Sequence, residues 1–275
     1  MLNMDLNILG PWKNNINHYA NLYKNAKPYE HVIIKNFFSD EYANKIYENL
    51  PTPLDNNRHW YHYDNPIEQK YSINNFIMYP EISKLYKLLE NNEFLKLIQQ
   101  ITGITNLESD PYLHGAGVHA YPNKGKLDMH LDYNIHPLTG KERRVNLILY
   151  MNKDWKHEYG GNIELFDANK NKITEVLPLF NTVILFRTSD ISFHGLSKPI
   201  NCPDDKFRRS IAIYYVSDPR ENLTKRFKAE YHPQLNQPVK ESLRKLYDIR
   251  KERLITREDL DTYYPNWRED GNGYW

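Results

Sequence analysis

The chain has 275 residues, of which 36 are lysine or arginine, 35 are aspartate or glutamate, and one is cysteine. The lone cysteine, Cys202, excludes an internal disulfide. No apolar run approaches the roughly twenty residues needed to cross a bilayer, and residues 1–5 lack the basic and apolar regions of a signal peptide. Length and composition therefore predict a cytoplasmic protein with a large core and no membrane partner.

The first third of the chain predicts a strand followed by helices. Residues 28–38 are rich in the β-branched and aromatic residues of strands, and Ser39 then precedes a helix predicted to residue 50, as an N-cap would. Two further helices are predicted over residues 80–89 and 93–101, the second ended by Gly103. These helices are expected to cover the outer face of a sheet.

From residue 112 onward the sequence predicts short strands separated by turn residues. There are eight candidates, which is the number of strands in a double-sheet jelly roll or cupin-like barrel. They cover residues 115–121, the segment around His130, and residues 145–151, 162–166, 173–177, 182–186, 192–196 and 208–216.

Two histidines and one aspartate in these strands form a candidate metal site. Because side chains alternate faces along a strand, His130 and Asp132 point the same way and Leu131 points the other way. His194 lies in an apolar stretch, residues 191–196, that is long enough for a neighbouring strand. Two imidazoles and one carboxylate occupy half of the coordination positions of an octahedral metal ion and leave the other half open. This ligand set suits non-haem Fe(II), with Zn(II) and Mn(II) as competitors.

Four short sequence motifs follow one another around these residues. They are Tyr121-Pro122 with Gly125 ahead of His130-Leu131-Asp132, then Leu149-Tyr150-Met151-Asn152-Lys153-Asp154-Trp155, then Gly160-Gly161-Asn162-Ile163-Glu164-Leu165-Phe166, and finally Phe193-His194-Gly195 with Phe207-Arg208-Arg209-Ser210. With them, residues 112–220 resemble the catalytic core of the 2-oxoglutarate and Fe(II)-dependent dioxygenases, in the prolyl hydroxylase branch.

The resemblance implies a role for each matching residue. His130, Asp132 and His194 would be the catalytic iron ligands. Arg208 would bind the distal carboxylate of 2-oxoglutarate, because a planar guanidinium holds a carboxylate with paired charge-assisted hydrogen bonds. The residues implied as further contacts of this cosubstrate are Tyr121, Tyr150 and Ser210.

Strand parity selects Arg208 in preference to Arg209. In an extended strand Arg208, Ser210 and Tyr214 share one face, which has the character of a site lining. Arg209 and Ile211 share the opposite face, which is expected to pack against an outer layer.

The implied activity is oxidation of an unactivated C–H bond with Fe(II), 2-oxoglutarate and O2, giving succinate and CO2, with ascorbate as a candidate reductant. A prolyl residue or free proline is the first substrate class, because the similarity is to prolyl hydroxylases. Arg208 stands where the collagen-type branch usually has lysine, which weighs against a collagen-like substrate. Two alternatives stay open: the same chemistry on a sugar, lipid, nucleobase or other small metabolite, and a cupin-like metal- or ligand-binding protein without turnover.

Two segments outside the predicted strands lie near the expected site. Residues 60–64 form an aromatic cluster, interpreted as a packed loop, with a lid over the site as the alternative. Residues 134–141 form a polar insertion after the first ligand strand. This insertion either shapes the substrate pocket or is a solvated loop with His136 facing water.

Beyond residue 219 the chain changes to a charged helical pattern. Leu243, Leu246 and Ile249 fall on one side of a helix predicted over residues 240–253. Its interspersed acidic residues favour a solvated, salt-bridged helix over a partner of nucleic acid. The aromatic residues within 263–267 and 274–275 are expected to dock on the barrel or on an adjacent subunit.

The predicted fold is therefore α+β and mainly β, with a double-stranded β-helix, or jelly roll, at its centre. We expect one enlarged domain, in which residues 1–111 form an N-terminal strand and support helices. Residues 112–218 would form the catalytic core, and residues 219–275 a C-terminal helical extension.

Overall fold

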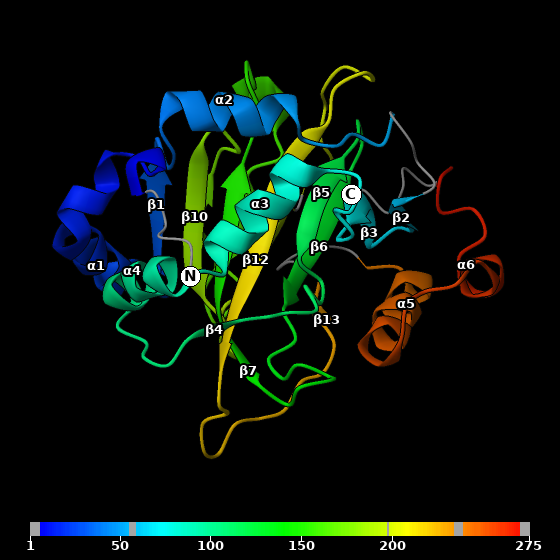
Figure 1. The fold of residues 1–275 in the computed structure, drawn as a ribbon. Helices are drawn as coiled ribbons and strands as arrows, with labels where there is room; N and C mark the ends of the chain where they lie inside the picture. The colour runs from blue at the N-terminus through cyan, green and yellow to red at the C-terminus, as the bar shows by residue number, and fades with distance from the viewer. Residues whose placement is uncertain (1–5, 55–58, 197, 234–238, 270–275) are drawn as a thin grey trace.

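The structure is a computed structural model that describes residues 6–54, 59–196, 198–233 and 239–269. Within these ranges the chain forms a curled antiparallel sheet with helices packed against it (Figure 1). In the same part of the chain no helix has the length and apolar character needed to span a bilayer.

The helices flank the sheet on two sides. Those described are α1 (Ile16–Asn25), α2 (Asp40–Glu48), α3 (Pro80–Leu89), α4 (Asn92–Thr102), α5 (Glu241–Glu252) and α6 (Arg257–Tyr263). In Figure 1, α2 and α3 cross in front of the sheet, α1 and α4 lie at its left, and α5 and α6 lie at its right. The predicted start of one helix and the predicted end of another are confirmed, although α2 ends at Glu48 and not at residue 50. The Ser39 side chain accepts a hydrogen bond from the Tyr42 N–H and caps α2, and Gly103, with a φ of +70°, ends α4.

The strands pair antiparallel into one sheet. Those described are β1 (His31–Lys35), β2 (Tyr61–Asp64), β3 (Glu68–Ile73), β4 (Glu108–Ser109), β5 (Gly117–Tyr121), β6 (Lys126–Leu131), β7 (Glu142–Tyr150), β8 (Ile163–Phe166), β9 (Lys172–Val176), β10 (Thr182–Arg187), β11 (His194–Leu196), β12 (Arg208–Ser217) and β13 (Glu230–Tyr231). Their order is β1-β10-β7-β12-β5-β3-β6-β11-β8-β9, while β13 pairs with β6, β2 with β3 and β4 with β12. All eight strands predicted between residues 115 and 216 are present, and the curled sheet is the predicted jelly-roll architecture.

Strand β3 joins the two halves of the curl. Its residues 71–73 pair with β5, and its residues 68–69 pair with β6. Strands β5 and β12 on one side of it, and β6 and β11 on the other, contribute side chains to one cavity.

The outer face of β12 packs against the N-terminal helices, as its parity predicts. Ile211, Ile213 and Tyr215 are buried in the core that also holds the apolar residues of α3 and α4. The Tyr215 hydroxyl donates a hydrogen bond to the Leu89 carbonyl at the end of α3, at 3.1 Å. The helices therefore fix the strand whose other face reaches the cavity.

Some elements are absent from the predictions. Residues 61–64 form strand β2, so the interpretation of residues 60–64 as a loop is wrong. Strand β3 has no apolar alternation, because Glu68, Lys70 and Ser72 all face the cavity. Helix α1 was missed because Tyr23 is its one fully buried side chain, which leaves no continuous apolar stripe.

The insertion at residues 134–141 is buried as far as His136 and exposed over residues 137–140, so the expectation that His136 faces water is wrong. The His136 side chain is buried, and its Nδ1 accepts hydrogen bonds from the backbone N–H groups of Leu138 and Thr139. Its Nε2 lies 3.1 Å from a carboxylate oxygen of Asp110. Pro137 lines the cavity, so this segment does contribute to the pocket.

The C-terminal helices form a second core with the sheet. Leu243 and Leu246 are buried there, as predicted, and Ile249 is partly buried. Tyr264 and Trp267 join them, so this part of the aromatic tail docks on the body of the same chain. The remaining aromatic residues of the tail, Tyr274 and Trp275, lie outside the described residues.

Candidate metal centre

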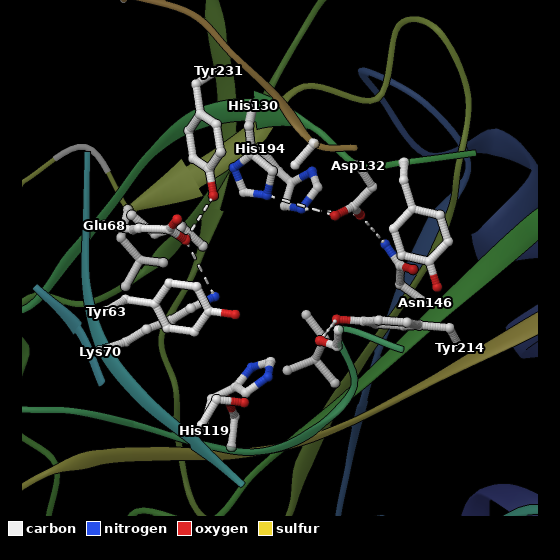
Figure 2. Close-up of a pocket in the computed structure, with 18 of the residues that line it drawn as sticks. Tyr63, Glu68, Lys70, His119, His130, Asp132, Asn146, His194, Tyr214 and Tyr231 are labelled. Atoms are coloured by element: carbon white, nitrogen blue, oxygen red, sulfur yellow. Dashed lines mark hydrogen bonds and ion pairs between the residues drawn. The ribbon is translucent and has the colours of Figure 1, made fainter. Parts of the chain in front are cut away.

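Three side chains converge on one end of the cavity. His130 lies near the end of β6, Asp132 follows that strand, and His194 begins β11 and pairs with His130 in the sheet. The three residues are buried, and each offers a ligand atom within 4.8 Å of the other two. In Figure 2 the two imidazoles and the carboxylate lie side by side along one wall of the cavity.

Backbone carbonyls orient both imidazoles. The Nδ1 of His130 lies 2.8 Å from the Asp128 carbonyl oxygen, and the Nδ1 of His194 lies 2.9 Å from that of Ser192. Because a carbonyl oxygen only accepts, each Nδ1 carries the proton and donates it. Each Nε2 is then the nitrogen with a free lone pair, which is the arrangement seen in metal-binding histidines.

The Asp132 carboxylate is held from behind by two side chains of β7. Its Oδ2 accepts hydrogen bonds from the Asn146 amide at 2.8 Å and from the Arg143 guanidinium at 2.9 Å. Burial raises the pKa of Asp132. The positive charge of Arg143 and the interactions with His194 and His130 together lower this pKa by more. The pKa of this carboxyl therefore lies well below its usual range, and the group is an anion at neutral pH.

The protonation states suit a metal ion. Burial and the neighbouring His130 lower the pKa of His194 to about 4, so its imidazole is neutral at neutral pH. Metal binding requires neutral imidazole and ionised carboxylate. Two nitrogens and one oxygen on one side, with the cavity on the other, match the donor set of non-haem Fe(II) sites.

Arg208 lies in the same cavity, which has a volume of about 330 Å³. The residue is 3% exposed, and its Nε donates a hydrogen bond to the Gly161 carbonyl at 2.6 Å. No acidic side chain among the described residues pairs with its guanidinium. A buried cation without an anionic partner is costly, so this position suits the carboxylate of a bound ligand.

The two predicted tyrosines flank that guanidinium. Its central carbon lies 5.0 Å from the ring centre of Tyr121 and 4.9 Å from that of Tyr150. Burial raises the pKa of Tyr150 to about 12, against the opposing charge of Arg208. The buried Tyr150 hydroxyl has no hydrogen-bond partner among the described residues, and the buried Ser210 pairs with Tyr150 in the sheet. The structure thus brings all the predicted cosubstrate contacts together.

Arg209 has a different environment. Its guanidinium carbon lies 4.7 Å from the ring centre of Tyr47, and its side chain lines a separate surface hollow. It therefore lies on the face opposite to Arg208, as strand parity indicates.

A group of polar residues on the cavity wall next to the metal centre is absent from the sequence-based predictions. Glu68 and Lys70 come from β3, and Tyr231 and Arg250 come from the C-terminal extension. The Tyr231 hydroxyl and the Arg250 Nε donate hydrogen bonds to Glu68 at 3.0 and 2.8 Å. One signal was available in the sequence. Polar residues recur every second position at Glu68, Lys70 and Ser72, which predicts a strand with one polar face.

Comparison with known proteins identifies this core. Residues 116–216 match the family model of the 2OG-Fe(II) oxygenase superfamily. The fold is similar to that of a prolyl hydroxylase from Trichoplax adhaerens, solved in complex with a peptide fragment of the hypoxia-inducible factor oxygen degradation domain. The TM-score is 0.56 at 18% identity, over 77% of this chain and 96% of that one.

Two further relatives differ from each other in chemistry. The chain is 28% identical to prolyl 3-hydroxylase OGFOD1 of Mus musculus over 78 residues, which are 26% of this chain and 14% of that protein. It therefore spans about a seventh of the length of that relative. The fold is also similar to that of SnoK, a non-haem α-ketoglutarate-dependent carbocyclase from nogalamycin biosynthesis, with a TM-score of 0.53 at 10% identity over 80% of this chain and 87% of that one.

Proposed function

Residues 116–216 belong to the 2OG-Fe(II) oxygenase superfamily, and on this premise we propose that the chain hydroxylates a prolyl residue or proline. The observation that supports an oxygenase reaction most directly is one cavity with the His130, Asp132 and His194 cluster and the unpaired cation of Arg208. Fe(II), 2-oxoglutarate and O2 are the cofactor and cosubstrates of this chemistry.

In this proposal His130, Asp132 and His194 hold Fe(II), which when bound supplies the oxidation of a C–H bond coupled to decarboxylation of 2-oxoglutarate. Arg208 pairs with the distal carboxylate of 2-oxoglutarate. The Tyr150 hydroxyl, which has no partner among the described residues, donates to the same cosubstrate, and Ser210 adds a second hydroxyl. Asn146 and Arg143 keep Asp132 ionised and aimed at the cavity.

Part of the cavity lining is apolar. Ile148, Ile163, Leu127 and Leu196 line the cavity together with Arg208 and the two histidines. A low-dielectric lining strengthens the pairing of Arg208 with a carboxylate. The same apolar lining favours the substrate over water beside the proposed metal-binding residues.

The prolyl substrate class is the finer part of the proposal. It is supported by the local identity to a prolyl 3-hydroxylase and by the fold likeness to a prolyl hydroxylase with a bound peptide. The fold itself hosts different reactions, because SnoK is a carbocyclase. A small metabolite as substrate is therefore the alternative that the experiment has to separate.

The test is succinate formation from 2-oxoglutarate with Fe(II) and ascorbate, measured with proline-containing peptides, free L-proline and a panel of small metabolites. Stimulation by a peptide or by L-proline, with a mass gain of one oxygen in that compound, is the expected result. Stimulation by another metabolite alone would move the substrate class. His130→Ala, which removes one proposed ligand, should abolish stimulated and unstimulated succinate formation without changing the circular dichroism of the fold.

A further inference from the structure

We infer that the substrate enters with a free carboxylate, which pairs with Lys70 on the cavity wall formed by β3. This inference rests on the proposed function and adds a substrate class to it, namely a small amino or imino acid in place of an internal residue of a peptide.

The first observation is an excess of positive charge on this wall. Glu68 is 1% exposed, and its carboxylate is hydrogen-bonded by the Arg250 Nε at 2.8 Å and by the Tyr231 hydroxyl at 3.0 Å. Burial raises the pKa of Glu68, but Arg250 and Lys70 lower it by more, so the carboxylate is ionised. One anion therefore faces two cations, Arg250 and Lys70, and the group has a net charge of +1.

The second observation is that Lys70 is the cation left over. Its Nζ lies 3.9 Å from Glu68, which is too long for a hydrogen bond, and its side chain is 13% exposed. Glu68 is the one carboxylate of the described residues within ion-pair distance of this ammonium. Its three N–H donors thus have no hydrogen-bond acceptor among those residues. Apart from Glu68, the ammonium contacts the Tyr63 ring, 4.9 Å from its centre, and it opens on the cavity, where a ligand can accept from it.

The third observation is where this ammonium lies. In Figure 2 the Lys70 side chain runs along the wall below Glu68 and ends in the cavity, beside the Tyr63 hydroxyl and across from His130 and His194. The pKa of His119 is lowered well below its usual value by burial and then by the charges of Lys70 and Arg208. The floor of the cavity is therefore under positive potential from two separate cations.

Arg208 and Lys70 are assigned to two different ligands, 2-oxoglutarate and the substrate. Arg208 serves 2-oxoglutarate in the proposed function, and Arg143 is already paired with Asp132. Lys70 is then the partly buried cation of the cavity lining that is available to the substrate. A carboxylate fits better than a phosphate dianion, because Glu68, 3.9 Å away, would repel a second negative charge.

The size of the cavity points to the same substrate class. Its volume of about 330 Å³ has to contain both 2-oxoglutarate and the reacting part of the substrate. Phe227 and Leu254 of the C-terminal extension add apolar side chains to its lining. A compact acid whose carboxylate reaches Lys70 fills such a space, whereas an internal prolyl residue of a peptide has no carboxylate of its own.

The experiment compares acids with their neutral amides. Succinate formation is measured with L-proline and L-prolinamide, and with the same acid and amide pair for a panel of other small amino acids. The thermal shift of the Zn(II)-loaded protein with each compound gives a readout that does not depend on turnover. We expect at least one acid to stimulate turnover and to stabilise the protein at a concentration about tenfold or more below that of its amide.

Lys70→Met keeps the length of the side chain and removes the charge. It should raise the KM of that acid about tenfold or more and leave its amide unaffected. Lys70→Arg should restore part of the preference. The matched control is Lys84→Met, which removes an exposed lysine of α3 that pairs with Glu81, and it should behave as wild type.

The inference is overturned if no acid of the panel binds or stimulates better than its amide, if an internal prolyl peptide is preferred over every free acid, or if Lys70→Met retains the preference for the acid. Failure of the proposed function is distinct from these outcomes. If the proposed function fails, the wild type forms no more succinate than the His130→Ala variant with any compound. Binding of 2-oxoglutarate to the Zn(II)-loaded protein is measured separately and reports on Arg208.

Discussion

The Arg250 guanidinium of α5 donates a hydrogen bond to Glu68 of β3 at 2.8 Å, across 182 residues of sequence. Both side chains are buried, and the Arg250 guanidinium carbon also lies 5.1 Å from the ring centre of Tyr231. A buried pair of this kind is strongly destabilising when one partner is removed, because the other remains buried with an uncompensated charge. The C-terminal helix is therefore joined to the cavity wall by an electrostatic contact.

Arg250→Met should lower the free energy of unfolding by about 3 kcal/mol. The cause is the loss of the partner that is closest to the Glu68 carboxylate, and urea denaturation followed by circular dichroism measures the change. Arg257→Met is the control, since this arginine of α6 is 71% exposed and pairs with Asp261 on the surface. It should cost about 0.5 kcal/mol or less. Equal costs for the two variants would contradict the structural importance of the Glu68 contact.

Acid should destabilise the protein partly through Glu68. The pKa of Glu68 is lower in the folded protein than in the unfolded chain. Between these two pKa values the unfolded state therefore binds more protons than the folded state. The stabilisation is fully present above the unfolded value of about 4.3 and is lost as the pH falls through the folded pKa. In Glu68→Gln the free energy of unfolding should fall less steeply between pH 5 and pH 3. An unchanged slope would show that Glu68 is not the titrating group.

Arg208→Ala should weaken 2-oxoglutarate binding by about 3 kcal/mol, or roughly two orders of magnitude in Kd. The reason is that a ligand carboxylate would lose its one buried cationic partner at this end of the cavity. Titration of 2-oxoglutarate into the Zn(II)-loaded protein measures the affinity. Arg209→Ala, on the opposite face of the same strand, should change it by less than about threefold. The reverse order would refute the assignment by strand parity.

Asn146→Ala should lower the affinity for Fe(II) by about 10- to 100-fold without removing a proposed ligand. Its amide donates to Asp132 at 2.8 Å, and its carbonyl oxygen accepts from the Arg143 Nε at 2.6 Å. Loss of the side chain leaves Asp132 with Arg143 as its one remaining hydrogen-bond donor from β7, and leaves Arg143 without one acceptor. Competition with a metal-binding dye measures the affinity. Asn44→Ala, at an exposed position of α2, should leave it unchanged.

Much of the site could be predicted because two rules act locally in the chain. Period two along β6 and β12 determines which side chains face the cavity, so His130 with Asp132, and Arg208 with Ser210, follow from neighbouring positions in the sequence. The helices α2 and α4 carry their own capping signals, Ser39 and Gly103. These features need no knowledge of the rest of the fold.

The cavity wall formed by β3 could not be predicted in the same way. Strand β3 has polar residues on its inward face because it borders a polar cavity, which reverses the usual rule that apolar residues point inward. Arg250 lies in a helix whose charges indicate a solvated surface, and only the fold shows that this one is buried against Glu68. Long-range pairing of charges has no periodicity in the sequence.

Strand β6, which bears His130, would have an open edge without later parts of the chain. On one side it pairs with β11, and on the other its residues 126–127 pair with β3 and its residues 130–131 pair with β13. An uncovered strand edge is a template for pairing with another molecule. By covering the half of this edge that carries His130, residues Glu230–Tyr231 protect the proposed metal-binding strand from self-association, in addition to the contact of the Tyr231 hydroxyl with Glu68.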